Sequence, residues 1–469
     1  MNSFDEIESL IRESNKEFIG KDLQPFLRIP SNTLNKKGAS IAKNFITSYI
    51  SEFSEKIEEI EGDINPLILA KVKGTIKESL LIYMMYDTQP INKEKEWITD
   101  PFGAVIKVLP SPLNELGDCI IARGAYNSKT PLICFLNIVK KLKENNELPI
   151  SLLLLFDGEE EMGSSTLLKF LERKDTFKDC IDVYYPSTKQ DLDGTAVIKL
   201  GYKGILSLTI KVYSRNKESH SGFSAMIPSP ATDLVSLLNT IYSNGQFQID
   251  SLKTKYHLTE SEISLINDLV QKINIEKIKR KAGIIETSKE NPRASFISYL
   301  FNPTFNISTL KSGFLDEGIK NIVANEAICN IDIRFAHHCS IDEIYKEIKK
   351  KVDDYSKTSK SHFELIKNIG YEGSRVEKDS ILVKSLIKSA RMLDINTEIW
   401  PISAAAAPLS QIQKKLGLNF ITGGLGIGGF AHSPNEFIQV DSILNTRIGF
   451  YYFLKNYSDL YLKEKLLKD

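Results

Sequence analysis

The feature that most restricts the fold of this chain is an apolar run, residues 151–155, followed at once by the acidic segment 156–164 (FDGEEEMGS). Such a run predicts a strand buried on both faces, as in a parallel sheet covered by helices. Glu159, Glu160 and Glu161 then follow the carboxyl end of that strand, where open α/β sheets place their active sites. Adjacent carboxylates at such a strand end suit a metal ligand beside a general base.

The acidic segment also has two purely structural explanations. It fits a solvated acidic turn, and it fits the amino end of a helix, where the helix dipole stabilises carboxylates. A metal site normally also takes imidazole from the surrounding loops, and this chain has no histidine before His220. The fold is therefore easier to predict than the activity.

Length and composition favour a cytoplasmic protein of two or three domains. The chain has 469 residues, against roughly 100–200 for a single domain. Its 60 basic and 60 acidic residues balance, so no overall field attracts nucleic acid or an anionic membrane. Five cysteines without CxxC spacing indicate reduced thiols and no structural zinc. The polar amino-terminal segment predicts no signal peptide, and no apolar run approaches the roughly 20 residues of a membrane span.

Alternating strand and helix patterns predict an α/β domain with a mostly parallel sheet. Helical spacing covers residues 4–18, 41–54, 131–144 and a segment from Ser164 onward. Strand patterns cover residues 66–72, 78–86, 151–156 and 181–185. A helix from Ser380 and strands near Ile399 and Phe420 later restore the same pattern. The first domain is therefore expected to comprise residues 1–203 and 375–469.

A different pattern over residues 204–374 predicts a separate, inserted domain. Strands and helices alternate there over residues 205–213, 230–242, 327–335 and 341–355, with a charged helical stretch over 250–291. This order is typical of a compact α+β domain. We therefore predict two domains, the second inserted into the first.

Six motifs then follow one another along the chain. They are residues 85–90 (MYDTQP) with Trp97 and 100–102 (DPF), 123–129 (RGAYNSK), 158–164 (GEEEMGS), 219–222 (SHSG), 332–334 (DIR) and 431–436 (AHSPNE). In this order they resemble the zinc-dependent aminoacylase, carboxypeptidase and carnosine-dipeptidase family of metallopeptidases. Acetylornithine deacetylase and succinyl-diaminopimelate desuccinylase belong to the same family. The resemblance implies a zinc-exopeptidase-like catalytic domain with an inserted α+β lid that also forms a dimer.

In that family two zinc ions share a bridging aspartate, and a glutamate takes a proton from the metal-bound water. Carried over by motif, the resemblance makes Glu160 the general base, and Glu161 and His432 metal ligands. Asp87 falls on the carboxylate that orients the first histidine ligand of the family. Without the resemblance, His432 would be interpreted as a surface-loop histidine and Asp87 as a turn-capping residue.

Two residues of the expected lid fall on substrate-binding positions of the family. His220 would steady the oxyanion, usually across a dimer, and Arg334 would bind the terminal carboxylate of the substrate. The structural alternatives are a turn residue for His220 and an ion pair within the lid for Arg334. The resemblance also implies a homodimer contact through residues 221–229 and the helix after Pro230, unless the charged stretch 250–291 covers that surface.

Three metal-ligand positions depart from the pattern of the family. Met85 stands at the first histidine, and its soft thioether does not suit zinc as imidazole does. Asn127 stands at the bridging aspartate, where a neutral amide supplies no bridging charge. The remaining carboxylate position falls at Ser187 or Thr188. These departures fall on the chemistry, while the motifs of the scaffold are retained.

Two further departures concern loops. Asp191 and Asp193 could replace the lost carboxylate only if their loop is rebuilt. The small Gly-Gly-Ser substrate loop of the family reads here as alanines followed by a proline, over residues 404–408. That change removes a hydroxyl donor from the substrate loop.

The surviving ligands lead to two hypotheses. At most one divalent ion, zinc or another, would be held by Glu161, His432 and the amide oxygen of Asn127. Catalytic zinc usually has three good protein ligands, so a site with two good ligands and one weak one would hold one ion or none. In the first hypothesis the chain is a metallopeptidase that hydrolyses a small peptide or an N-acyl amino acid. In the second it is a catalytically impaired relative that serves as a dimeric binding or assembly protein.

Overall fold

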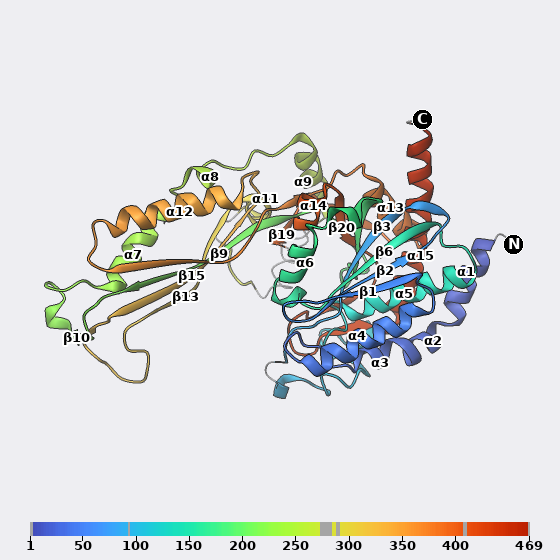
Figure 1. The fold of residues 1–469 in the computed structure, drawn as a ribbon, viewed down its shortest axis with the longest axis horizontal. Helices are drawn as coiled ribbons and strands as arrows, with labels where there is room; N and C mark the ends of the chain where they lie inside the picture. Colours follow the sequence, from blue (N-terminus) through green and yellow to red (C-terminus); the bar gives the residue numbers. More distant parts are fainter. Residues whose placement is uncertain (1–2, 92–93, 273–283, 288–290, 407–409, 468–469) are drawn as a thin grey trace. The chain divides into compact units, whose positions relative to one another are not determined.

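The computed structural model describes residues 3–91, 94–272, 284–287, 291–406 and 410–467. The chain divides into two compact units (Figure 1). The first unit comprises Met1–Leu200, Arg375–Trp400 and Gln411–Asp469, and the second comprises Gly201–Ser374 and Pro401–Ser410. Among the described residues, no helix is both long enough and apolar enough to cross a membrane.

A six-stranded sheet forms the centre of the first unit, in the order β1-β2-β6-β3-β7-β20. The parallel strands are β6 (Ile150–Asp157), β3 (Ile76–Met85), β7 (Cys180–Pro186) and β20 (Asn419–Gly423). The antiparallel additions are β2 (Leu67–Val72) and β1 (Lys56–Ile60). Every residue of β6 is buried, as expected for a parallel strand covered on both faces.

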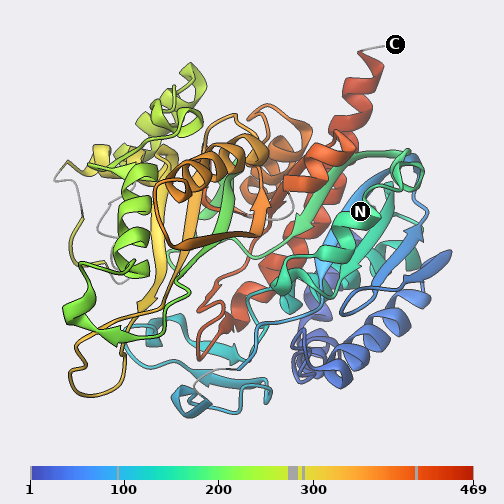
Figure 2. The ribbon, with the colours of Figure 1, turned by 60° about the vertical axis from the view of Figure 1, so that its left-hand side comes forward.

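Helices cover this sheet. The helix α5 (Lys129–Glu144) contacts β3 and β7, and the 27-residue α15 (Val440–Leu466) contacts both α5 and α13 (Ile381–Arg391). Figures 1 and 2 show α15 as the long red helix that ends near the carboxyl terminus. The helix α4 (Lys36–Ser51) begins earlier than predicted, because the Asn35 side chain caps it by accepting a hydrogen bond from the Gly38 amide.

A smaller sheet, of order β21-β22-β5-β4, joins two distant parts of the chain within the first unit. Its strands are β4 (Val105–Val108), β5 (Asp118–Ile121), β21 (Gly428–Gly429) and β22 (Phe437–Gln439). Phe437 pairs with Ile121, and the Ala122 amide donates to the carbonyl of Glu436 at 3.0 Å. The loops that follow β5 and precede β22 therefore lie side by side.

Further elements of the first unit include α1 (Ser3–Glu13), α2 (Asn15–Phe18), α3 (Gln24–Leu27), α6 (Ser165–Phe170), β8 (Ala196–Lys199) and β18 (Thr397–Trp400). At the junctions between the units lie β17 (Ser374–Arg375) and α14 (Ser410–Leu416).

The second unit is built on an antiparallel sheet of order β13-β15-β9-β16. Its strands are β9 (Gly201–Tyr213), β13 (Thr304–Ser312), β15 (Glu326–Phe335) and β16 (His362–Tyr371). The helices α7 (Pro230–Ile241) and α12 (Ile341–Ser356) pack against it and bury a shared apolar core. Buried residues alternate along β15, so one face of the sheet is turned to this core.

The short elements of the second unit are β10 (Ser219–His220), β11 (Tyr242–Ser243), β12 (Gln246–Phe247), α8 (Asp250–Lys253), α9 (Glu260–Lys272), α11 (Pro292–Phe301), β14 (Ile322–Val323) and β19 (Ser403–Ala406). The predicted helical stretch 250–291 is thus helical over α8 and α9, while residues 273–283 and 288–290 lie outside the described residues. Residues 407 and 408 of the alanine-rich loop also lie outside them. The predicted α/β class with an inserted α+β unit is confirmed.

Candidate functional site

Glu159 anchors the turn that follows β6. Its side chain is fully buried, and its Oε1 atom accepts hydrogen bonds from the amides of Ile64 at 2.6 Å and Asn65 at 3.0 Å. Thr166 donates through both its amide and its hydroxyl to the same carboxylate. Burial alone raises the pKa of Glu159, but these hydrogen bonds outweigh it and lower the pKa below its usual value. The first acid of the segment is therefore structural and not a solvated turn residue.

Glu160 and Glu161 lie in the short 3-10 helix Glu160–Met162 that follows this anchor. Oε2 of Glu161 accepts a hydrogen bond of 2.8 Å from the side-chain amide of Gln89. Burial raises the pKa of Glu160 well above its usual value, and the negative charges of Glu161 and Asp87 raise it further. A carboxyl group with a raised pKa is suited to proton transfer near neutral pH.

Asp87 is buried just beyond the end of β3. Its Oδ2 atom accepts hydrogen bonds from the Thr33 hydroxyl at 2.7 Å and from the Glu161 amide at 3.1 Å. Its Oδ1 atom has no hydrogen-bond partner among the described residues. Met85, which the resemblance would place at the first histidine of the family, is 1% exposed and carries no donor for that oxygen.

Three predicted residues meet at the centre of the site. The side-chain amide nitrogen of Asn127 donates to Oε1 of Glu161 at 3.2 Å and lies 3.1 Å from Nε2 of His432. Nε2 of His432 is also 3.3 Å from Oε1 of Glu161. The hydrogen bond to Glu161 raises the pKa of His432 above its usual value. The structure therefore brings together all three residues that the sequence offered as metal ligands.

Glu436 holds the loop that presents Asn127, a role that the sequence did not reveal. Its Oε2 atom accepts from Nη1 of Arg123 at 2.7 Å and from the Gly124 amide at 3.0 Å. Its Oε1 atom accepts from the amides of Tyr126 at 3.0 Å and Asn127 at 2.8 Å. Both side chains of the ion pair are almost fully buried. The only signal in the sequence is that Glu436 ends one motif and Arg123 opens another.

The Arg123 guanidinium has a second contact within the same cluster of motifs. It lies over the ring of Trp97, 5.4 Å from the ring centroid, as in a cation–π interaction. Trp97 is itself buried. This packing limits the freedom of the arginine to leave Glu436.

Ser187, one of the two positions that the sequence offered for the missing carboxylate, is buried. The Ser187 hydroxyl lies 2.7 Å from the hydroxyl of Thr422, and the Ser187 amide donates to the carbonyl of Gly423. Further along the loop, Oδ1 of Asp193 accepts from the Thr195 amide at 3.1 Å. The Asp191 amide donates to the carbonyl of Thr195. Within the described ranges, no group of three or more His, Cys, Asp or Glu side chains is arranged to hold a metal ion.

His220 and Arg334 lie in the second unit. His220 is exposed at the end of β10, and its Nδ1 atom accepts from the Gly222 amide at 3.0 Å. Arg334 lies on β15 opposite Thr304 of β13, and its amide donates to the Thr304 hydroxyl at 3.1 Å. Their side chains thus belong to a different unit from Glu160, Glu161 and His432.

The fold and these contacts place the chain in the class of metallopeptidases. Residues 81–456 match the family described as "Peptidase family M20/M25/M40", and the chain belongs to this family. The recognition made from the six motifs is therefore confirmed.

Two of the relatives are named as dipeptidases. The chain is 25% identical over 398 residues to the Cys-Gly metallodipeptidase dug1 of Schizosaccharomyces pombe, covering 79% of this chain and 80% of that protein. It is 24% identical over 352 residues to the human Beta-Ala-His dipeptidase, covering 73% of this chain and 66% of that protein.

Solved structures agree with this fold over nearly the whole chain. The M20 family metallo-carboxypeptidase Sso-CP2 of Sulfolobus solfataricus has a TM-score of 0.83 and 27% identity, and the match covers 93% of this chain and 98% of that one. Human carnosine dipeptidase 1 has a TM-score of 0.78 and 18% identity, with coverage of 97% and 98%. At that identity the second likeness supports the fold alone.

Proposed function

We propose that this chain is an impaired member of the M20 family, which binds a small peptide or an N-acyl amino acid without assembling a two-metal centre. The observation that supports this most is the contact of Asn127 with both Glu161 and His432. The side-chain amide nitrogen of Asn127 lies where the resemblance places the bridging carboxylate of the family. It donates to Oε1 of Glu161 and contacts Nε2 of His432, two atoms that a metal centre would direct at a cation.

The donor set does not fit two divalent ions. A neutral amide at Asn127 leaves two neighbouring cations without the bridging charge that offsets their repulsion. The buried thioether of Met85 is a poor zinc ligand, and the Ser187 hydroxyl is already paired with Thr422. At most one ion, zinc or another divalent metal, would find Glu161 and His432 as ligands, one fewer than catalytic zinc usually has from protein.

A second candidate function is hydrolysis of an amide bond at a single-metal site, which one specific observation favours. Oε1 of Glu161 and Nε2 of His432 lie 3.3 Å apart, so both atoms can be directed at one point. Glu161 and His432 would hold a divalent ion, and such an ion would supply Lewis acidity at that point. Glu160 lies beside Glu161 with a raised pKa and would accept a proton there.

We further propose a homodimer formed through the second unit, with His220 and Arg334 as substrate-binding residues. Phe223 and Met226 support such a contact, since 52% and 81% of their surfaces are exposed next to His220. Exposed apolar side chains of this kind often mark a protein interface. Sedimentation equilibrium at micromolar concentration should detect a dimer, and Met226→Glu should weaken it. A monomer throughout would contradict this part of the proposal.

A cytoplasmic location is also proposed. All five cysteines are free, and four of them are buried. Free thiols are typical of reducing compartments.

The deciding experiment combines metal analysis with hydrolysis assays. The purified chain, loaded with zinc and then dialysed, should retain at most one ion per chain by mass spectrometry. Hydrolysis of Cys-Gly and β-Ala-His should be absent or very slow. If slow hydrolysis is detected, Glu160→Gln should abolish it, while the exposed control Glu172→Gln should not.

The restoring variant gives the reverse test. Met85→His combined with Asn127→Asp should raise the metal content toward two only if a carboxylate also reaches the site from residues 187–193. Two stoichiometric zinc ions in the unmodified chain, with rapid hydrolysis that depends on Glu160, would contradict the proposed function and leave a working peptidase.

A further inference from the structure

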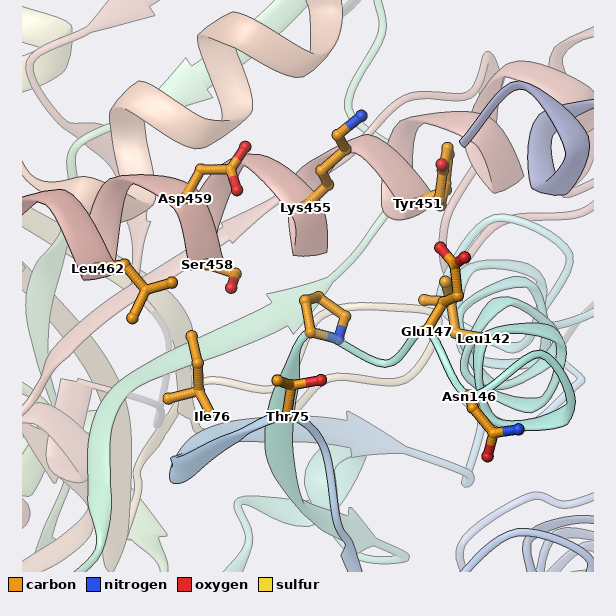
Figure 3. Close-up of a pocket in the computed structure, with 11 residues that line it drawn as sticks. Thr75, Ile76, Leu142, Asn146, Glu147, Tyr451, Lys455, Ser458, Asp459 and Leu462 are labelled. Atoms are coloured by element: carbon orange, nitrogen blue, oxygen red, sulfur yellow. The ribbon is translucent and has the colours of Figure 1, made fainter. Parts of the chain in front are cut away.

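The first unit has a hollow at the end of the sheet opposite to the candidate site. Its volume is about 330 Å³, and Figure 3 shows the residues that line it. The helix α15 forms one wall, and the start of β3 with the turn between α5 and β6 forms the other. Sites for small ligands usually measure about 300–1,000 Å³, so this hollow suits a molecule of roughly amino-acid size.

The hollow is separate from the candidate site. Ile76, which lines it, is the first residue of β3, and Met85, at the candidate site, is the last. At about 3.3 Å per residue, the length of this strand separates the two places by about 30 Å. A ligand in the hollow would therefore contact none of Glu160, Glu161 or His432.

The floor of the hollow is apolar. Ile76, Leu142 and Tyr451 line it and are 8%, 2% and 1% exposed. Leu462 and Pro149 extend this apolar surface toward its edges. Such a floor favours a ligand with an apolar side chain, since burying that side chain removes apolar surface from water.

Charged groups of both signs surround this floor. Lys455 and Asp459 lie one turn apart on α15, and Glu147 lies on the turn after α5, on the side of Tyr451 and away from Asp459 (Figure 3). Among the residues that the structure describes, neither Glu147 nor Asp459 forms a salt bridge. Two carboxylates without cationic partners can accept hydrogen bonds from an ammonium group, and Lys455 can donate to a carboxylate.

We propose that this hollow is a second ligand site, and that it binds a small zwitterion, a free amino acid with an apolar side chain. The ligand's ammonium group would contact Glu147, its carboxylate Lys455, and its side chain the floor. Because a peptidase-family scaffold meets peptides and their component amino acids, such a site would let the chain respond to the level of free amino acid. The proposal does not depend on catalytic activity at the candidate site.

The test is a titration of the full chain with L-leucine. Calorimetry and thermal unfolding both measure the binding. We expect one site per chain. Leucinamide, which lacks the carboxylate, and 4-methylpentanoate, which lacks the ammonium group, should each bind at least about tenfold more weakly, the effect expected from one charge-assisted hydrogen bond.

Variants locate the site. Glu147→Gln and Lys455→Met should weaken leucine binding at least about tenfold. Thr75→Trp should abolish it by filling the hollow from its exposed edge. The matched control Glu144→Gln, on the same helix as Leu142 but outside the hollow, should leave binding unchanged. All variants should first be shown to unfold cooperatively.

The outcomes also separate this inference from the proposed function. Glu160→Gln should retain full leucine binding, whatever it does to hydrolysis or metal content. Absence of leucine binding at millimolar concentration would overturn the inference. Binding that survives Thr75→Trp but is lost with Arg334→Ala would overturn it as well, because the amino acid would then occupy the peptide site.

Discussion

The side-chain amide nitrogen of Asn127 lies 3.2 Å from Oε1 of Glu161, so a hydrogen-bond donor faces the one glutamate that the sequence offers as a metal ligand. The same nitrogen lies 3.1 Å from Nε2 of His432. One neutral side chain thereby joins the loop after β5, the turn after β6 and the loop before β22. The first prediction concerns this contact.

Replacing Asn127 by aspartate should make the stability of the chain depend on metal. The variant places a carboxylate where a donor now meets Glu161, so in the presence of a chelator it should lose about 1–3 kcal/mol of unfolding free energy. Added Zn²⁺ or Co²⁺ should restore stability, because the introduced carboxylate, Glu161 and His432 then provide three ligands. Urea unfolding with and without metal measures the effect. The unmodified chain is the control, and an equal response of both proteins would contradict the prediction.

Glu436→Gln should destabilise the first unit strongly. The substitution leaves the buried Arg123 without its counter-charge, and breaking a buried ion pair typically costs about 3–5 kcal/mol. Chemical denaturation measures this loss. Asp63→Asn is the matched control, since it removes an ion pair with Lys169 in which both side chains are exposed, and it should change stability far less. Similar losses in the two variants would argue against the role given to Glu436.

His432 should stabilise the chain at acid pH and lose this effect as the pH rises through its raised pKa. Its hydrogen bond to Glu161 raises its pKa in the folded chain above the usual 6.5. The resulting stabilisation is fully present below the unfolded pKa and is lost as the pH rises through the folded pKa. His432→Gln should therefore lower stability at about pH 6 and much less at about pH 9. His362→Gln, in the second unit, is the control, and a deficit independent of pH would refute the argument.

Glu159 should show the opposite dependence. Hydrogen bonds from Ile64, Thr166 and Asn65 outweigh its burial and lower its pKa below the usual 4.5 in the folded chain. This stabilisation is present above the unfolded pKa and is lost as the pH falls through the folded one. Glu159→Gln should lower stability by about 1–3 kcal/mol at neutral pH.

The stability gap of Glu159→Gln, which is the difference in unfolding free energy between this variant and the unmodified chain, should disappear as the pH is lowered. Urea unfolding from neutral pH down to about pH 3 tests this, since the carboxylate becomes protonated first in the unfolded and then in the folded state. The exposed Glu144→Gln is the control, and its gap should stay small throughout. A gap for Glu159→Gln that persists undiminished at the acid end would mean that its packing, and not its charge, carries the effect.

The parts of the fold that could be predicted are those with a single local cause. The run 151–155 is apolar because β6 is buried on both faces, and α12 shows clear helical spacing because only one of its faces is buried. The 27-residue α15 was missed because residues on all its sides are buried, which removes the amphipathic pattern. The edge strand β1 was missed because most of its residues are charged and partly exposed.

The candidate site likewise has features that could be predicted from the sequence and features that could not. The substitutions at Met85, Asn127 and Ser187 are visible in the sequence, and their chemistry follows from residue type alone. What Asn127 contacts could not be predicted, because the contact depends on three loops from distant parts of the chain. The part played by Glu436 was hidden for the same reason, since the pairing of β22 with β5 creates it.

The ion pair between Arg123 and Glu436 joins residues that are 313 positions apart. On the ribosome the arginine emerges first, and the whole second unit must be synthesised before its partner appears. A nascent chain that stalls earlier keeps an uncompensated guanidinium where the finished molecule has a neutral pair. Such a product cannot close the loop around Asn127, so it stays open to chaperones and proteases. The same contact that shapes the candidate site therefore distinguishes a completed polypeptide from an incomplete one.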